Sequence, residues 1–174
     1  MSSGARQKLL ELDAYYTNRL KIAEQPGTLR SLASFFAHSG DSWFWLPGLA
    51  LLWWLAPEPW KELAIIMIVG VALTAATVFL IKLTVRRRRP AGQWGEFYRK
   101  TDPHSFPSGH AARSAMLAVV AIGVAPPWFV LTLCLWAPLV ILARVAMGVH
   151  YLSDVIAGAL LGVVLGILTI FIMR

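Results

Sequence analysis

Residues able to bind an anion and to move a proton stand together in one segment, Phe106-Pro107-Ser108-Gly109-His110, directly before an apolar run. Pro107 suits the first turn of a helix, where a missing N–H costs nothing. Ser108 and Gly109 bring a hydroxyl and backbone N–H groups to that helix start, and such a start attracts anions. His110 adds an imidazole that gives or takes a proton near neutral pH. The alternative is an ordinary Ser-Gly turn with one polar histidine at a membrane interface.

Two further groups of polar residues interrupt apolar sequence. The first begins at Lys82 and includes four consecutive arginines, a pattern that by itself favours a solvated or lipid-binding cluster. Lys82 and Arg89 are seven residues apart, so on a continuing helix they would share one face. The second group holds Arg144, His150 and Asp154. Because Asp154 follows His150 by four residues, it can hydrogen-bond one ring nitrogen and leave the other free to attack.

These residue types suit phosphoryl transfer. Lys82, Arg89 and Arg144 can grip phosphate oxygens, the arginines in bidentate fashion. His110 and His150 supply the general acid and the nucleophile that such a reaction needs without a metal. A divalent metal site is the competing interpretation, but cations outnumber the single carboxylate, which is the wrong balance for such an ion. We therefore expect neither a metal nor another cofactor.

The composition indicates a membrane protein. Of 174 residues, 57% are hydrophobic and 14% are charged, with a mean hydropathy of +0.62. Soluble domains are roughly half apolar and about a quarter charged. The net charge is +7, and the basic residues flank apolar segments. We therefore expect membrane lipids and a phosphorylated lipid substrate as partners, and no nucleic acid.

Helices are expected to position these clusters. Residues 5–25 have the three- and four-residue spacing of an amphipathic helix on the membrane surface, and the apolar stretch 29–37 is too short to cross a bilayer. Glycines spaced four apart in the last apolar segment predict close helix packing. Five longer apolar segments are the expected spans: 43–56, the shortest, then 63–83, 111–125, 128–147 and 155–173.

The order of the spans places all three clusters on one membrane face. The second and fourth spans end there, and the third and fifth begin there. Ionisable residues gathered at one membrane surface are candidates for function. The sequence thus predicts an all-α, polytopic membrane bundle of about five transmembrane helices plus the N-terminal amphipathic helix. Residues 1–40 would form an interfacial region and residues 41–174 the transmembrane catalytic domain.

In its motifs the chain resembles the type 2 phosphatidic acid phosphatase (PAP2) superfamily. That family's signature is Lys-x6-Arg-Pro, then Pro-Ser-Gly-His, then Ser-Arg-x5-His-x3-Asp. Ala143 replaces the usual serine of the third motif, which puts one phosphate-side hydrogen bond in question and leaves the proton-transferring residues in place. The matching residues are Lys82, Arg89 and Pro90, then Pro107, Ser108, Gly109 and His110, then Arg144, His150 and Asp154.

The resemblance implies a PAP2/haloperoxidase-like helical core that hydrolyses a phosphate monoester or diphosphate on a lipid without a metal. Phosphatidate, phosphatidylglycerol phosphate and polyprenyl (di)phosphates are the implied substrate classes. His150 would form a phosphohistidine, Asp154 would orient it, and His110 would protonate the leaving alkoxide and later help to activate water. The remaining matched residues would bind the phosphate: Lys82, Arg89, Ser108, the Gly109 N–H and Arg144.

The charge distribution predicts the orientation in the membrane. Five basic residues within residues 6–30, together with the arginines at 86–89, lie on the active-site side, whereas Lys61 and Arg174 lie on the other. The positive-inside rule then places the N-terminus and the active site on the cytosolic face, in a bacterial-type inner membrane.

Other functions fit part of the pattern. A non-catalytic lipid-phosphate binding or transport protein would keep the anion site without the reaction. A vanadate haloperoxidase has a similar constellation but is soluble, and a small membrane scaffold would explain none of the three clusters. His104 favours a solvated loop position, and Arg113 would snorkel or pair with Asp102, so we expect neither in the site.

Overall fold

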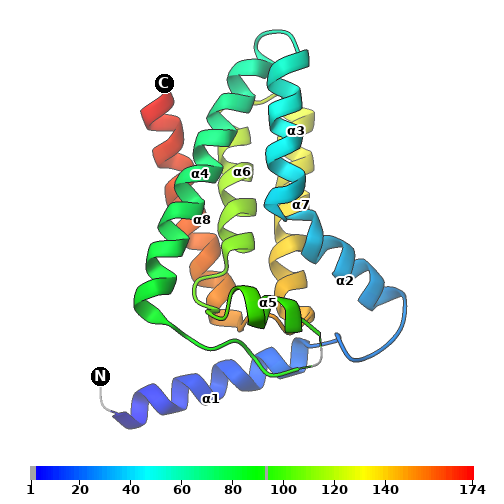
Figure 1. Ribbon diagram of the computed structural model, residues 1–174, viewed down its shortest axis with the longest axis vertical. Coiled ribbons are helices and arrows are strands. Elements are labelled where there is room, and N and C mark those ends of the chain that lie inside the picture. Colours follow the sequence, from blue (N-terminus) through cyan, green and yellow to red (C-terminus); the bar gives the residue numbers. More distant parts are fainter. Residues whose placement is uncertain (1–2, 93) are drawn as a thin grey trace.

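The computed structural model describes residues 3–92 and 94–174, and this part of the chain is helical apart from loops and one isolated bridge between Arg88 and His104. Among the described residues, three long and two shorter helices are apolar. These helices stand side by side as a bundle, and α1 lies across the end of the bundle opposite the C-terminus (Figure 1). In chain order the helices are α1 (Ser3–Leu20), α2 (Thr28–Ser39), α3 (Ser42–Leu55), α4 (Trp60–Val85), α5 (Glu96–Thr101), α6 (Gly109–Val124), α7 (Pro127–Ala146) and α8 (Leu152–Met173).

Helix α6 lies at the centre of the bundle and packs against α4, α7 and α8. Its contact with α8 is close because α8 presents Gly158, Gly162 and Gly166 to it. A Cβ atom at Gly158 would lie 2.5 Å from the carbonyl oxygen of Ser108, and one at Gly166 would lie 3.1 Å from that of Met116. Small residues let helix backbones approach one another in lipid. The predicted packing role of these glycines is confirmed.

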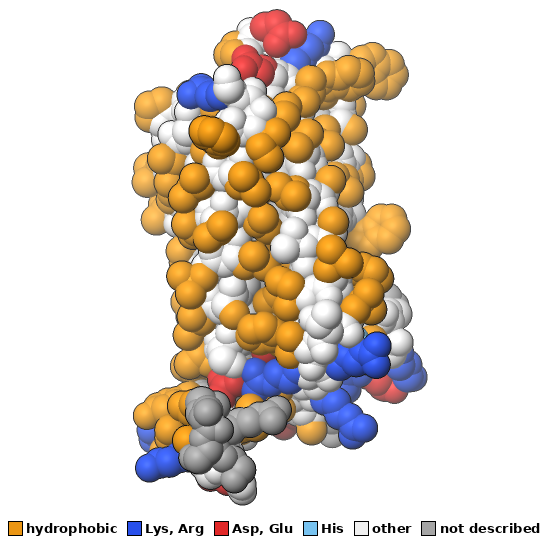
Figure 2. Space-filling model, turned by 90° about the vertical axis from the view of Figure 1, so that its left-hand side faces the viewer, with side chains coloured by type: hydrophobic (Ala, Val, Ile, Leu, Met, Phe, Trp, Pro, Cys, Tyr) orange, Lys and Arg blue, Asp and Glu red, His pale blue; other side chains and the backbone are white. Residues whose placement is uncertain are grey.

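The surface of the bundle suits a membrane. In the described part of the chain, three helices are long and apolar enough to cross it, α4, α7 and α8, whereas α3 and α6 are shorter apolar helices of 14 and 16 residues. Hydrophobic side chains cover the face shown in Figure 2 between two charged ends. An apolar surface of this extent is stable when lipid covers it. The expected polytopic helical membrane fold is confirmed, and the number of spans stays a prediction.

The helix does not continue from Lys82 to Arg89, and the expected end of the N-terminal helix is wrong. Helix α4 ends at Val85, because Arg86 adopts a left-handed backbone conformation with φ 48°. Arg89 therefore lies in the following loop and does not share a helix face with Lys82. Helix α1 ends at Leu20 instead of residue 25, and the chain beyond it is held by a bond from the N–H of Ile22 to the carbonyl oxygen of Ala146 at 2.8 Å. The division at residue 40 stays a prediction.

Candidate active site

A cavity of about 340 Å³ lies where the C-terminal ends of α4 and α7 meet the start of α6. Six of the eight residues predicted for the site line this cavity: Lys82, Arg89, Gly109, His110, Arg144 and His150. The other lining residues are Thr74, Ala75, Val78, Phe79, Tyr98, Thr101, Asp102 and Arg113. Asp102 is the one acidic residue among these described lining residues, so positive charge dominates the cavity.

Arg144, in the last turn of α7, is fully buried. Its Nη1 donates to the carbonyl oxygen of Ala37 at 3.1 Å, and its guanidinium carbon lies 4.6 Å from the centre of the Tyr98 ring. Its Nε and Nη2 atoms have no hydrogen-bond partner within the described part of the chain. Buried charged donors without partners are costly, and an anion would satisfy them. Arg144 is therefore prepared to bind an anion in the cavity.

Lys82 and Arg89 meet on the carboxylate of Asp102 instead of on a common helix face. Both donate to Oδ2 of Asp102, Arg89 across 2.8 Å. Arg89 also donates to the carbonyl oxygens of Asp102 at 2.6 Å and of Val149 at 2.9 Å, which fixes its guanidinium at the cavity edge. The Asp102 side chain remains 41% exposed. The carboxylate of Asp102 therefore lies between Lys82 and Arg89, where it binds both cations as an anion would.

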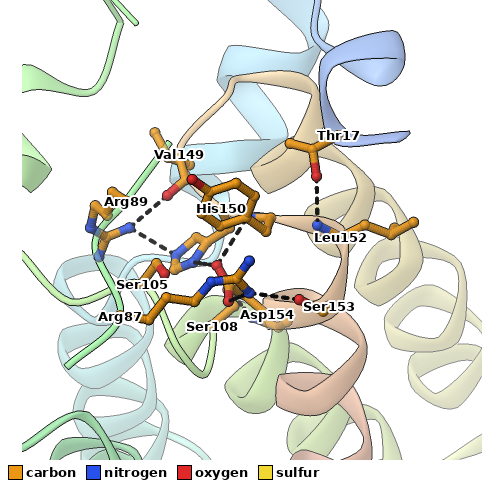
Figure 3. A network of polar contacts seen from close by, with 12 residues as sticks. Thr17, Arg87, Arg89, Ser105, Ser108, Val149, His150, Leu152, Ser153 and Asp154 are labelled. Carbon is orange, nitrogen blue, oxygen red and sulfur yellow. Dashed lines mark hydrogen bonds and ion pairs between the residues drawn. The ribbon is translucent and has the colours of Figure 1, made fainter. Parts of the chain in front are cut away.

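His150 lies in the loop between α7 and α8 and is buried. Arg89 donates from Nη1 to its Nε2 at 3.0 Å, so Nε2 carries the lone pair and Nδ1 the proton. Nδ1 is 3.6 Å from Oδ2 of Asp154, longer than a hydrogen bond (Figure 3). Burial, followed by the positive charges of Arg89, Arg144 and Lys82, holds the pKa of His150 well below 6.5. The ring is therefore neutral at pH 7 and can act as a nucleophile.

Residues 63–174 match the sequence profile of the PAP2 superfamily. The chain belongs to this family. It is 31% identical over 141 residues to the undecaprenyl-diphosphatase of Sulfolobus acidocaldarius. The aligned region covers 79% of this chain and 68% of that relative. The chain is also 32% identical over 145 residues to the decaprenylphosphoryl-5-phosphoribose phosphatase of Mycolicibacterium smegmatis, covering 79% and 74%.

Two solved structures share the fold of this PAP2 protein. LpxE of Aquifex aeolicus has a TM-score of 0.71 at 27% identity, covering 93% of this chain and 94% of that one. The PAP2-type phosphatidylglycerolphosphate phosphatase of Bacillus subtilis has a TM-score of 0.75 at 24% identity, covering 93% and 84%, and shows the fold alone. The sequence relatives are named phosphatases. The expected class, a membrane PAP2 enzyme that hydrolyses phosphoric monoesters or diphosphates, is confirmed.

The two remaining predicted residues of the PAP2 site, Asp154 and Ser108, are fully buried and lie behind the cavity lining. Asp154 accepts from the N–H of Tyr151 at 2.9 Å through Oδ2 and from Nη1 of Arg87 at 2.8 Å through Oδ1. Ser108 caps α6 by accepting from the N–H of Ala111, and its own N–H donates to the carbonyl oxygen of Asp154 at 2.9 Å. Ser108 therefore joins the starts of α6 and α8, which carry the second and third PAP2 motifs.

Sequence reasoning missed a second layer of residues that comes from α1. Arg87 donates from Nη2 to Asp13 at 2.7 Å and from Nη1 to the hydroxyl of Ser153 at 2.7 Å. Asp13 accepts the N–H of Ser153 at 3.0 Å. The hydroxyl of Thr17 accepts the N–H of Leu152 at 3.0 Å (Figure 3). Side chains of α1 thus cap the helix that carries Asp154. The available signal was the i, i+4 spacing of two polar residues, Asp13 and Thr17.

Arg113 and His104, which were not expected in the site, have surroundings that differ from those predicted. Arg113 lines the cavity, so its expected place outside the site is wrong, and it donates to the carbonyl oxygen of Gly40. His104 is half-buried instead of solvated, and its backbone forms the bridge to Arg88. His104 is not among the lining residues of the cavity.

The corner between α2 and α3 also reaches the site, which the sequence did not indicate. Through Oδ1 the carboxylate of Asp41 contacts Nε2 of His110, and through Oδ2 it contacts Nδ1 of His38 at 3.1 Å. Burial opposes ionisation of Asp41, but the hydrogen bonds of His110 and His38 and the charge of Arg144 outweigh it and lower the pKa of Asp41 below its ordinary value. Asp41 is therefore a carboxylate at neutral pH.

Proposed function

We propose that the protein is a metal-independent lipid phosphatase that releases phosphate from a lipid phosphate monoester or diphosphate through a phosphohistidine on His150. The observation that carries this proposal is the buried guanidinium of Arg144, whose Nε and Nη2 lack partners within the described residues. It lines the same cavity as the neutral His150 and the cations Lys82 and Arg89. An anion that satisfies these donors would lie next to a nucleophile.

In the first step, Nε2 of His150 forms a bond to phosphorus while the P–O bond to the lipid breaks. Arg89 would transfer its hydrogen bond from Nε2 to a phosphate oxygen, and Arg144 and Lys82 would hold the others. Losing one such preorganised donor costs about 10²–10³-fold in rate in well-studied enzymes. Asp154 would receive a hydrogen bond from Nδ1 once the present 3.6 Å separation closes.

His110 moves the protons of the reaction. In the first step it gives a proton to the leaving lipid oxygen, which departs as an alcohol or a phosphorylated lipid. In the second step it accepts a proton from water as the water oxygen bonds to phosphorus and the P–N bond breaks. Inorganic phosphate then leaves, and both histidines return to their starting states. The N–H of Gly109, at the start of α6, would bind a phosphate oxygen. Ser108 would support that helix start from behind.

The lipid class is supported by the cavity and by the names of the relatives. Ala75, Val78 and Phe79 of α4 give the cavity an apolar side, and Phe79 is 60% exposed on the lipid-facing surface. A hydrocarbon tail would fit there while its phosphate lies among the cations. The sequence relatives are named for polyprenyl phosphates. We propose a phosphatidate, phosphatidylglycerol phosphate or polyprenyl (di)phosphate as substrate.

Phosphate release by the purified protein tests the reaction. Phosphatidate, phosphatidylglycerol phosphate and undecaprenyl diphosphate in detergent are each incubated with wild type, His150→Ala and the control His104→Ala, with and without EDTA. Wild type and the control are expected to release phosphate equally with EDTA, and His150→Ala to lose at least about 10³-fold. Loss of wild-type activity in EDTA would refute metal independence. Equal activity of His150→Ala would refute the nucleophile, and lipid binding without release would favour the non-catalytic alternative.

We also propose that the active site faces the cytosol of a bacterial-type inner membrane, on the strength of the basic residues at that end of the bundle. A cysteine at the exposed position Lys100, in a Cys134→Ala background, tests this orientation. A membrane-impermeant maleimide is expected to label it only after the cells are permeabilised. Labelling in intact cells would place the active site on the opposite face.

A further inference from the structure

Asp41 stands at the start of α3 and does not cap it. An aspartate at a helix N-cap ordinarily accepts a backbone N–H of the first turn. The Asp41 side chain makes no such bond, and instead its two oxygens contact Nε2 of His110 and Nδ1 of His38. The side chains of Asp41 and His110 are only 19% and 14% exposed. The carboxylate in the capping position therefore lies between His110 and His38 and leaves the helix start uncapped by a side chain.

The backbone beside Asp41 is held rigidly by side chains from three helices. Trp45 donates to the carbonyl oxygen of Ser39 at 3.0 Å, and Trp136 donates to its hydroxyl at 2.9 Å. Arg113 donates to the carbonyl oxygen of Gly40, where a Cβ atom would lie 3.2 Å from Cδ2 of the His110 ring. The corner is therefore fitted closely around His110, and Asp41 has little freedom to turn away.

We propose that Asp41 is a positioning residue that fixes the orientation and the tautomer of His110, so that Nε2–H stays on Asp41 and Nδ1 exchanges the proton with the substrate. This inference rests on the proposed function, in which His110 is the general acid. A carboxylate on one ring nitrogen holds the imidazole in place and stabilises the imidazolium form. Burial of the ring disfavours that form, as do the positive charges of Arg144 on α7 and Arg113 on α6, and the carboxylate of Asp41 opposes them.

The proton balance with Asp41 is the same as in the proposed reaction, with the atoms now specified. As the P–O bond breaks, the imidazolium of His110 gives its Nδ1 proton to the lipid oxygen and becomes neutral. As water attacks the phosphohistidine, Nδ1 takes a proton from that water and the P–N bond breaks. The carboxylate of Asp41 keeps its hydrogen bond from Nε2–H through both steps and never carries the proton itself.

The two histidines of the site thus have carboxylates at different distances, in keeping with their different tasks. His150 must be neutral to attack, and its carboxylate, Asp154, is 3.6 Å away and shared with Arg87. His110 must carry a proton into the first step, and its carboxylate is in direct contact. A direct contact favours the charged ring more than a distant one does.

Dependence on the leaving group tests this proposal. Phosphatidate has an alkoxide leaving group that needs a proton, whereas the p-nitrophenolate of p-nitrophenyl phosphate leaves without one. Asp41→Asn is expected to lower kcat/KM for phosphatidate by about 10–10²-fold and to change that for p-nitrophenyl phosphate by less than about threefold. Asp41→Glu should recover part of the phosphatidate activity, and Asp41→Asn/His110→Ala should be no slower than His110→Ala. The exposed Glu62→Gln, at the other end of the bundle, is the carboxylate control.

Changes in stability must be separated from changes in the role of Asp41. Unfolding temperature is measured for every variant, and asparagine is chosen because it is as good an N-cap residue as aspartate. Equal losses for both substrates, or no loss, would overturn the positioning role of Asp41. A selective loss in Asp41→Asn without one in His110→Ala would also overturn it, because Asp41 would then act through another group. If His110→Ala shows no selective loss, the acid assigned in the proposed function is wrong as well.

Discussion

Nη1 of Arg89 donates to Nε2 of His150 across 3.0 Å, so the atom proposed to attack phosphorus faces a cation proposed to hold the phosphate. The bond requires a lone pair on Nε2 and therefore a neutral ring. The same guanidinium donates to the carbonyl oxygen of Val149, the neighbour of His150 in the chain. Arg89 thus fixes the loop that carries His150 and presents a donor beside the atom proposed to attack.

The pH dependence of kcat/KM follows from the burial of His150. Burial and the charges of Arg89, Arg144 and Lys82 hold its pKa well below 6.5. Since the neutral ring is needed and it is protonated only below that lowered pKa, activity is expected to persist as the pH falls through 6.5 and to fall at more acid pH. Profiles of kcat/KM, which report the free enzyme, check this. Arg89→Gln removes one nearby positive charge, which raises the pKa of His150. The acid limb of the profile should therefore move to higher pH when both proteins are measured on the same substrate. A wild-type limb at or above 6.5 would contradict the prediction.

Asp102 is expected to compete with phosphate for Lys82 and Arg89. Its carboxylate accepts from both cations, yet its side chain is 41% exposed, so each pair is weak and can be displaced. Asp102→Asn should lower the inhibition constant of inorganic phosphate by about fivefold, equivalent to about 1 kcal/mol. The control is Glu96→Gln, which removes an exposed carboxylate paired with Lys100. Weaker inhibition in Asp102→Asn would mean that Asp102 orients the cations and does not compete.

The bundle was predictable because each membrane helix corresponds to one continuous apolar segment, whose length can be read directly from the sequence. The last two apolar segments, 128–147 and 155–173, correspond closely to Pro127–Ala146 and Leu152–Met173. Most of the predicted site residues also line the cavity, because the order of the spans decides which helix ends share a face. The left-handed turn at Arg86 was not predictable, since arginine has no preference for that conformation.

The supporting carboxylates could not be predicted for a different reason. Asp13 acts on Ser153 and Asp41 acts on His110, both far along the chain, and neither aspartate belongs to a motif. The periodicity of α1 indicates an apolar face but not which loop its polar face will meet. An aspartate after Gly40 favours a helix cap in any sequence-based interpretation, and only the packed corner shows that its side chain points to a histidine.

Loss of Asp13 is expected to loosen the start of α8. Asp13 pairs with Arg87 at 2.7 Å and accepts the N–H of Ser153, and its side chain is 12% exposed. Asp13→Asn should lower the free energy of unfolding by about 1–3 kcal/mol, because hydrogen bonds to charged groups contribute on that scale. It should also lower kcat, since α8 carries Asp154. Thermal unfolding and lipid phosphate release measure both effects. Glu11→Gln, an exposed change on the same helix, should leave them unchanged, and an equal effect of the two variants would count against the prediction.

Gly158 is expected to control the position of His110 through the α6–α8 contact. A Cβ atom there would lie 2.5 Å from the carbonyl oxygen of Ser108 and 3.2 Å from Cβ of Ala111, so either α8 or the backbone before His110 must move in Gly158→Ala, and we expect both to move. Overpacking of this kind costs about 1–3 kcal/mol of stability. A displacement near 1 Å can lower the rate about 10²-fold.

Gly48→Ala is the matched control for Gly158→Ala, because a Cβ atom at Gly48 meets no described atom within 4 Å. In the helix interior that change should be neutral or stabilising by up to about 1 kcal/mol. Unfolding temperature and phosphatidate hydrolysis are compared for the two variants. Wild-type kcat in Gly158→Ala would show that α8 can shift without carrying the start of α6 with it, and that the close packing serves stability alone.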